Sequence, residues 1–457
     1  MMKKGMILNK KYILVIVFAL FGIISFAQNN LSMYYMEKIP QSRYSNPGMI
    51  SPYRYYFSFP MLSSINVSFS NSFKMTDVIK HRSIDDSLYI DKSFIDKLKD
   101  NNFASVEYKH ELISFGFKIK SNYFSFNVNE NVGLRFNYAK DLFNLILNGN
   151  TPSINNEFNL DGMGLNFIHY REYGLGYARE INDKLSVGAK LKYLYGGMNI
   201  YTEQSDISFT TDEEAYYLNM QAKYKINTSI PEEFDFADYM FKNKNKGFAF
   251  DIGANYKIND KFSVSGSLID FGSIKWKSNV YNYESTGENV QFSGLDFNDL
   301  FSKDPTADNF GELLDSLQNS FIAEETENSY RSPLPKKIFI GTAYALTEKI
   351  NLGFLYRNEI VNKKSNSAIA FSYNQELGKV FSFTGSYSIF NRTYTNIGLG
   401  FALNLGGFQF YAMTDNVFGI DILNSRNANV IFGFNFAFHK KEEKEKKYVP
   451  ISTDIKK

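Results

Sequence analysis

The chain has no cysteine and very little histidine, two residue types that often support catalysis or metal binding. The absence of cysteine excludes disulfides, thiolate metal ligands, a thiol nucleophile and a lipid-modified N-terminal cysteine. Among 457 residues there are only 4 histidines, so a nucleophile has few possible bases. The acidic stretches at 83–87 and 211–214 lack the spacing of a calcium loop. We therefore expect no enzyme, no metal site and no cofactor.

Strong net charge and long apolar runs are also lacking. The formal net charge is +2, and the lysines within residues 3–11 account for it, so nothing indicates nucleic-acid binding. After residue 27, no stretch approaches the roughly 18 uninterrupted apolar residues of a membrane-spanning helix. Helical membrane proteins are therefore excluded, apart from an anchor at the N-terminus.

The N-terminus has the three parts of a secretory signal. Lysines concentrate in residues 3–11, residues 12–26 are apolar, and Ser25 and Ala27 supply the small residues that a signal peptidase requires. The apolar run is short for a membrane anchor, which needs about 20 residues. We expect residues 1–27 to be a cleaved signal peptide, the alternative being an uncleaved anchor.

Phenylalanine (44 residues) and tyrosine (32 residues) are abundant and alternate with small or polar residues. With one exception, residues 184–195 are apolar at odd positions and polar or glycine at even ones. Similar alternation recurs at 248–258, 381–389, 397–405 and 432–438. Because successive side chains of a strand point to opposite faces, each segment predicts a strand with one apolar face. Large aromatics opposite Gly, Ser and Asn are typical of a membrane barrel with a polar lumen.

The connections alternate between short turns and mostly longer loops. Short turns are predicted at 120–122, 181–184, 258–261, 346–349, 376–379 and 404–407. Outer-membrane barrels have short periplasmic turns and longer outer loops, so the sequence predicts an all-β, antiparallel transmembrane barrel of about 14 strands over residues 55–438. An even strand number places both termini in the periplasm. Residues 202–226 leave an alternative of about 16 strands, but we prefer a hairpin above the membrane.

Helical pieces are predicted in the outer loops. Residues 140–150 look amphipathic with Gly149 as a C-cap, and 87–102 are similar. In 309–327 one helical face carries apolar side chains, which are Phe310, Leu313, Leu314, Leu317 and Phe321. These helices either pack on the barrel rim or form an apolar landing site for a ligand. The charged residues 439–457 lack periodicity and predict a disordered periplasmic tail.

Residues 28–54 precede the first predicted strand and are expected to plug the lumen. At roughly 3.3 Å per extended residue they are long enough to fold back inside, where an open lumen would leak small solutes. Prolines in this stretch limit helix formation and lower the entropy lost on ordering. Pro60 predicts a bulge or kink in the first strand, because proline cannot donate a ladder hydrogen bond. The residues singled out in this plug are Pro40, Arg43, Asn46, Pro47 and Gly48.

The strand alternation also turns several charged side chains toward the lumen. These are Arg135, Lys190, Lys192, Asp251, Lys257, Arg357 and Glu359. One interpretation is that they pair with each other or with the plug and rigidify the barrel. The other is that they contact a ligand headgroup or form a gate.

Several blocks of the sequence resemble a family of uncharacterised outer-membrane barrels. They are "IPQSRYSNPG", "FPMLSS", "SFGFKIKSNYFSFNV", "KDLFNLILNGN" and "REYGLGYAREINDKLSVGAKLKYLYG", in order along the mature chain. More distantly, the chain is similar to FadL-type transporters of fatty acids and other hydrophobic compounds. Those are barrels whose N-terminal plug carries Asn-Pro-Ala, and this chain has Asn46-Pro47-Gly48, with glycine in place of alanine.

The resemblance implies an outer-membrane location in a Gram-negative bacterium and plug-gated or lateral passage of small hydrophobic molecules. The alternative is a barrel that does not transport but binds a partner protein or takes part in secretion. The expected partners are outer-membrane lipid and either a hydrophobic ligand or a periplasmic or surface protein. A surface lipase is disfavoured, because no Ser–His pairing stands out.

Overall fold

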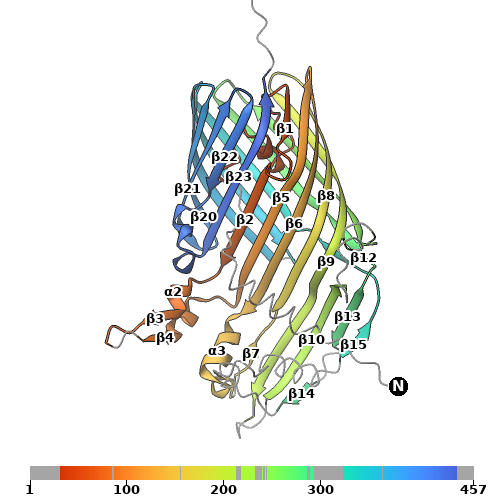
Figure 1. Cartoon of the computed structure of the whole chain (residues 1–457). Helices are drawn as coiled ribbons and strands as arrows, with labels where there is room; N and C mark the ends of the chain where they lie inside the picture. Colours follow the sequence, from red (N-terminus) through yellow and green to blue (C-terminus); the bar gives the residue numbers. More distant parts are fainter. Residues whose placement is uncertain are drawn as a thin grey trace, which may run out of the picture.

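The computed structural model describes residues 31–84, 87–154, 156–212, 218–231, 239, 242, 244–285, 289–292, 323–362 and 364–439. The predicted signal peptide and most of the tail lie outside these residues. In the described part, 14 antiparallel strands close into one barrel (Figure 1). This confirms the predicted fold class. No helix among the described residues is long and apolar enough to cross a membrane.

The barrel strands follow one another around the wall in chain order. Two of them are interrupted, the first as β1 and β2 and the eighth as β16 and β17. Their bounds are β1 (Tyr55–Ser58), β2 (Ser64–Asn71), β5 (Asn101–Ile119), β6 (Asn122–Ala139), β8 (Gly164–Glu180), β9 (Leu185–Thr211), β11 (Lys246–Lys257), β12 (Phe262–Trp276), β16 (Tyr330–Pro333), β17 (Lys336–Thr347), β18 (Ile350–Val361), β19 (Lys364–Leu377), β20 (Phe381–Phe390), β21 (Thr393–Leu405), β22 (Phe408–Thr414) and β23 (Asn427–Phe438).

The last strand closes the sheet onto the first. β23 pairs with β1 from Tyr55 opposite Phe438, and with β2 as far as Ser70 opposite Asn427. β1 and β2 pair with β5 on their other side. Closure leaves no free sheet edge in the wall, as a lipid environment requires.

The alternation of the sequence corresponds to the two faces of the wall. On β11, Phe248 and Phe250 point outward and are exposed, whereas Ala249 and Asp251 point inward and are buried. The outward faces of other strands carry exposed apolar residues in the same way, including Leu175 and Leu191. An outward face of this kind is suited to lipid, and the inward face forms a polar lumen.

One side of the barrel is much taller than the other. β9 has 27 residues, and its second half pairs with β10 (Leu218–Ser229) instead of β11. β11 pairs only with the first half of β9. The predicted hairpin within 202–226 is therefore confirmed, and its strands do not add to the barrel wall. The green strands in Figure 1 show this extension next to β13 (Val280–Ser285), β14 (Asn289–Phe292) and β15 (Ala323–Thr326).

All six predicted short turns lie at one end of the barrel, and the longer loops lie at the other. The loop elements are η1 (Pro40–Tyr44), α2 (Met75–Val78), β3 (Ile79–His81), β4 (Leu88–Ile90), η2 (Lys92–Lys97), α3 (Lys140–Asn148), η3 (Thr151–Ser153), β7 (Phe158–Asn159), η5 (Val417–Ile420) and η6 (Ile422–Asn424), of which η1 precedes the barrel. The predicted helix at 140–150 is α3, and Gly149 follows it with a φ of 71°.

Two expectations for the outer loops were wrong. Residues 87–102 form β4 and the short η2 instead of an amphipathic helix, because β4 pairs with β3 in a small hairpin. The end of the helix predicted at 309–327 is strand β15, which pairs with β13. The apolar face predicted for that helix lies outside the described residues.

The first strand is interrupted where Pro60 was expected to disturb it. Residues 59–63 separate β1 from β2 and leave the ladder. Met61 has a φ of 63°, and Phe59, Met61 and Leu62 are exposed on the outer face. Backbone bonds from Phe59 to β23 and from Met61 to β5 keep the wall continuous across the bulge.

Candidate functional site

The N-terminal segment (31–54) lies inside the barrel and is bonded to its wall on several sides. The backbone N–H of Ser32 donates to Asp415 Oδ1 (2.7 Å) beyond β22. The Tyr35 hydroxyl lies within hydrogen-bond distance of backbone carbonyls on β17 and β18 (2.8 and 2.6 Å). The Tyr53 hydroxyl donates to a side-chain oxygen on β21 (3.0 Å). Because these partners come from different strands, the segment spans the lumen.

Arg43 is the buried cation of this segment. η1 begins with Pro40, whose fixed φ suits the first position of a helical turn. Arg43 Nε donates to the Pro40 carbonyl (3.0 Å), and Nη2 donates to the Tyr56 hydroxyl (3.1 Å). The guanidinium also lies 4.2 Å from the ring centroid of Tyr123. Hydrogen bonds and ring faces thus replace water around a cation that is costly to bury.

Gln41 joins two strands that flank the first one. Its Nε2 donates to Glu111 Oε1 on β5 (3.0 Å) and to Asn435 Oδ1 on β23 (2.9 Å). Asn435 Nδ2 donates back to Gln41 Oε1 (3.0 Å). The Tyr44 hydroxyl donates to the second carboxylate oxygen of Glu111. The N-terminal segment is therefore attached to both sides of the interrupted first strand.

Asn46, Pro47 and Gly48 lie against a pair of wall glycines. Gly188 on β9 and Gly253 on β11 are directly opposite each other. A Cβ atom at Gly188 would collide with the Pro47 carbonyl, and one at Gly253 with the Asn46 side chain. Asn46 Nδ2 donates to a β11 carbonyl (3.1 Å), and its Oδ1 accepts from the Gly48 N–H (2.9 Å). The glycines thus make the space in which this tripeptide docks.

A β-bulge between β11 and β12 directs two carboxylates to one lysine. The register shifts between Phe250 and Ile252, and Asp270 on the bulge has a φ of 62°. The Asp270 N–H donates to Asp251 Oδ1 (2.8 Å). Lys192 Nζ lies 2.8 Å from Asp251 Oδ2 and 2.5 Å from Asp270 Oδ1. All three side chains face the lumen and are shielded from solvent.

Further ion pairs extend from this centre along the lumen. On β8, Glu172 lies 3.8 Å from Lys192. On β17, Lys337 lies 3.7 Å from Asp270 and 3.8 Å from Glu359. The whole group is called the inner charge cluster, and its members are Glu172, Lys190, Lys192, Asp251, Asp270, Lys337, Arg357 and Glu359.

The charged residues that were predicted to face the lumen are not all in one place. Those that belong to the inner charge cluster are Lys190, Lys192, Asp251, Arg357 and Glu359. Arg135 lies apart on β6, with its guanidinium 3.8 Å from the ring centroid of Phe103. Lys257 is exposed at the end of β11 near the short turns.

Sequence reasoning missed Glu172, Asp270, Lys337 and Glu111. Asp270 was missed because the bulge adds one residue to β12 and changes which face the following positions occupy. The available signal was an aspartate between two apolar neighbours in "SLIDFGS". Glu111 lies beside a second register shift, on β5, which hides it in the same way.

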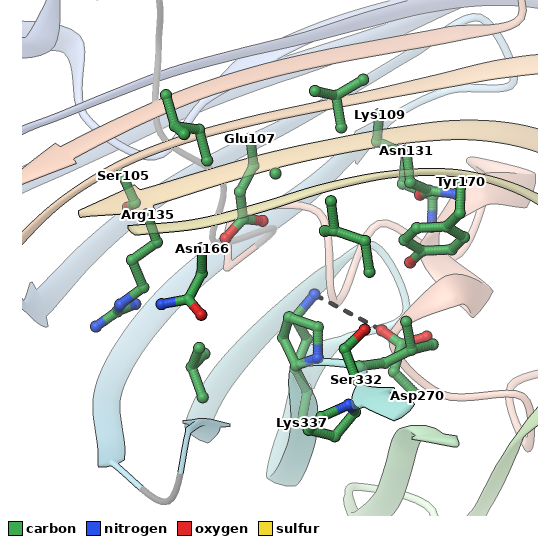
Figure 2. A pocket seen from close by; sticks show the side chains of 18 of the residues that line it. Ser105, Glu107, Lys109, Asn131, Arg135, Asn166, Tyr170, Asp270, Ser332 and Lys337 are labelled. Carbon is green, nitrogen blue, oxygen red and sulfur yellow. Dashed lines mark ion pairs between the residues drawn. The ribbon is translucent and has the colours of Figure 1, made fainter. Parts of the chain in front are cut away.

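Between the N-terminal segment and the outer loops, the lumen widens into a cavity of about 140 Å³. Tyr44 and Ser45 contribute to its lining from the side of the N-terminal segment. Figure 2 shows Arg135 and Asn166 at one side and Tyr170 at the other. The cavity is thus bordered by the N-terminal segment and by the inner charge cluster.

Toward the loops, contacts between non-adjacent strands narrow the barrel. Asn362, in the turn between β18 and β19, donates from Nδ2 to Asn166 Oδ1 on β8 (2.9 Å). Lys364 Nζ donates to Asn101 Oδ1 on β5 (2.7 Å). These bonds cross the lumen because β18 and β19 are far from β5 and β8 around the wall.

The outer-loop apolar residues predicted to receive a ligand are Phe310, Leu313, Leu314, Leu317 and Phe321, and all lie outside the described residues. The described helix α3 packs on the rim, where Phe143 contacts Phe94 and Tyr138 (ring centroids 5.2 and 5.5 Å apart). Within the described part of the chain, no group of three or more His, Cys, Asp or Glu side chains is placed to hold a metal ion.

Comparison with solved structures gives barrels at low sequence identity. The toluene transporter TbuX of Ralstonia pickettii is 10% identical, with 92% of this chain and 100% of that chain covered and a TM-score of 0.44. The toluene transporter TodX of Pseudomonas putida is 8% identical, with 87% and 91% covered and a TM-score of 0.39. A FadL homologue of Pseudomonas aeruginosa is 8% identical, with 91% and 96% covered and a TM-score of 0.39.

No curated protein matches the chain. A sequence-family model does match. The model of DUF5723, a family of unknown function, matches residues 47–415, which include most of the barrel and the end of the N-terminal segment. The chain therefore belongs to the DUF5723 family.

Proposed function

We propose that the protein is an outer-membrane channel that admits small, largely apolar molecules and is closed by its N-terminal segment. The closed sheet and its outward apolar face support the membrane location. The short turns then face the periplasm, and the loops around α3 and β10 face outward. Passage requires the N-terminal segment to shift, because it spans the lumen.

The observation that carries this proposal is the way the N-terminal segment is held. Many of its bonds are between neutral groups and are made to several strands, such as the Ser32 hydroxyl at 2.8 Å from the Ser386 hydroxyl on β20. Neutral hydrogen bonds of this kind contribute about 1 kcal/mol each. A segment held by many such bonds is ordered at rest and can still be displaced piece by piece.

The first test is conductance in planar bilayers. We expect the mature protein to conduct poorly and a variant lacking residues 28–51 to open a stable pore, because the deletion removes most of the lumenal contacts. A shift in gel mobility on heating checks that the variant remains a folded barrel. Equal conductance of the two folded proteins would contradict the proposal.

The second test locks the segment instead of removing it. The native chain has no cysteine, so Ser32→Cys with Ser386→Cys introduces one defined pair. We expect oxidation to abolish uptake of radiolabelled naphthalene by cells that express the variant, and reduction to restore it. Each single variant serves as the control. If the disulfide is confirmed to form and uptake is the same before and after oxidation, movement at this contact is excluded.

A second candidate function is a platform for a partner protein at the cell surface. It is favoured by exposed apolar side chains that lie close together in η5 and η6, where Phe418 is 59%, Ile420 80% and Leu423 62% exposed. Exposed apolar patches of soluble regions mark interaction sites. Crosslinking in intact cells from a photoreactive residue at Ile420 tests it, and a channel without a partner would give no discrete crosslinked product.

A further inference from the structure

The proposed function does not specify the chemical class of the ligand. The residues that line the cavity limit that class. Cationic side chains outnumber carboxylates around this space. The cations are Lys109, Arg135, Lys190, Lys192, Lys337 and Arg357, and the carboxylates are Glu107 and Asp270. A lining of this kind favours a ligand that carries a negative charge in addition to an apolar part.

The carboxylates that balance several of these cations lie behind them. Asp251 pairs with Lys192 (2.8 Å) and Glu359 with Arg357 (3.0 Å), but neither carboxylate lines the cavity. The positive ends of these pairs therefore face the space and the negative ends face the wall. Fixed dipoles oriented in this way stabilise an anion in the cavity.

Two of the cations make no close ion pair. Within the described residues, no carboxylate oxygen lies within 4.0 Å of Lys109 Nζ or of the Arg135 guanidinium. Lys109 Nζ instead lies 4.8 Å from the ring centroid of Tyr44. Arg135 Nε donates to Asn137 Oδ1 (3.2 Å). Glu172 and Asp270 act on Lys109, and Glu107 and Glu359 act on Arg135, only from longer range. An anionic ligand in direct contact with either cation would therefore add a stronger interaction.

Lys109 and Lys190 converge near the N-terminal segment. Lys190 Nζ lies 4.1 Å from the ring centroid of Tyr44, and its distance to Glu172 is 4.0 Å, the limit for an ion pair. Two ammonium groups from β5 and β9 thus approach the same tyrosine ring. A single carboxylate lying between them would gain two charge-assisted hydrogen bonds.

The remaining lining and the size of the cavity limit the rest of the ligand. Inward-facing Ile168, Tyr170 and Phe339 supply apolar surface. An apolar cavity of about 150 Å³ holds a benzene molecule, and the volume here is about 140 Å³. We propose that the cavity binds a small organic anion of benzoate size, with its carboxylate between Lys109 and Lys190.

Equilibrium binding to the mature protein in mild detergent tests this proposal. The probes are sodium benzoate, its neutral analogue benzamide, and inorganic phosphate, all followed by calorimetry. We expect benzoate to bind saturably and at least tenfold more tightly than benzamide, with phosphate a weak competitor. Equal affinity for benzoate and benzamide, equal competition by phosphate, or no saturable binding of benzoate would each overturn the proposal.

Substitution of Lys109 locates the site. Lys109→Met removes a cation that makes no close ion pair, so the barrel should fold, and we expect benzoate affinity to fall about tenfold while benzamide binding is unchanged. Lys109→Arg should retain most of the affinity. Lys257→Met is the control, because it removes a lysine that is exposed at the end of β11 and does not line the cavity. Unchanged benzoate affinity in Lys109→Met would place the anion elsewhere and overturn the assignment.

The inference rests on the proposed function only in taking this cavity as the channel's ligand site. The experiments can therefore distinguish a failure of the channel proposal from a failure of the anion-site proposal. Benzoate binding without a pore in the deletion variant would contradict the channel and support the anion site. A pore without benzoate binding would support the channel and contradict the anion site.

Discussion

At the scale of single residues, Lys192 holds together the centre of the inner charge cluster. Asp251 and Asp270 both approach its ammonium group, and the bulge between β11 and β12 keeps the two carboxylates close. Removing the cation from such a site leaves like charges facing each other away from water. Breaking a buried pair in this way is far more costly than replacing the pair as a whole.

We expect Lys192→Met to lower the free energy of unfolding by roughly 3 kcal/mol. Urea unfolding of the barrel, followed by the fluorescence of the single tryptophan, Trp276, measures this change. Replacing Asp251 and Asp270 by asparagine in the same variant should restore part of the loss. A midpoint equal to that of the native chain would show that the cluster is solvated in the folded barrel.

Gly188 is a second residue whose replacement has a defined consequence. Any side chain there meets the Pro47 carbonyl, so Gly188→Val should displace the N-terminal segment by overpacking. We expect a barrel that folds but conducts in planar bilayers without any deletion. Gly266→Ala is the control, since its Cβ meets no atom closer than 3.8 Å. A Gly188→Val protein as closed as the native one would show that the tripeptide does not need this space.

At the scale of elements, the strands and turns could be predicted and the bulges could not. Alternation of apolar and polar residues fixes which positions share a face, and this located the lumenal Lys190, Lys192 and Asp251. A bulge shifts the alternation by one residue, so the positions after it face the other side of the sheet. Only the pairing with the neighbouring strand reveals this shift. Asp270 and Glu111 were missed for this reason. The wall contacts of the N-terminal segment depend on strands distant in sequence, which local patterns do not specify.

α3 is an element whose stability depends on one side chain. Phe143 lies among Phe73, Phe94 and Tyr138 on the outer rim, away from the barrel wall proper. Phe143 is half-buried, so removal of its side chain should cost roughly 1–2 kcal/mol, and this loss of stability falls on the loop alone.

We expect Phe143→Ala to make the outer loops between β2 and β5 and between β6 and β8 much more susceptible to protease, with the unfolding midpoint of the barrel unchanged. Limited proteolysis with mass spectrometry of the fragments measures this. Asn144→Ala, on the same helix, is the control and should resemble the native chain. Equal cleavage in both variants would mean that the aromatic cluster does not order the rim.

At the scale of the whole molecule, the N-terminal segment acts as an internal brace between strands. It contacts the wall at β5, β9, β11, β17, β18, β21 and β23. Many of the wall groups that it reaches are buried and polar, including Glu111 and Asn435. Without the segment these groups face an open, water-filled lumen.

We expect the variant lacking residues 28–51 to unfold at a lower urea concentration than the native barrel and to lose several kcal/mol of stability. The net value of a hydrogen bond is about 1 kcal/mol, and several are lost together. The variant should still show the gel shift of a closed barrel, because the strand ladder is intact. An unchanged midpoint would mean that the segment adds nothing to the stability of the wall.

The contact between Gln41 and Asn435 also sets an order of assembly. The two residues are 394 positions apart, and Asn435 belongs to the final strand. Gln41 reaches β5 and β23 together, so it cannot take its place until the sheet has closed around it. We therefore expect the segment that is synthesised before any strand to be the last to become ordered. If the protein is the channel proposed above, every newly inserted molecule should pass through a stage in which its wall is complete and its lumen is open, and sealing of the membrane should be the final event of its biogenesis.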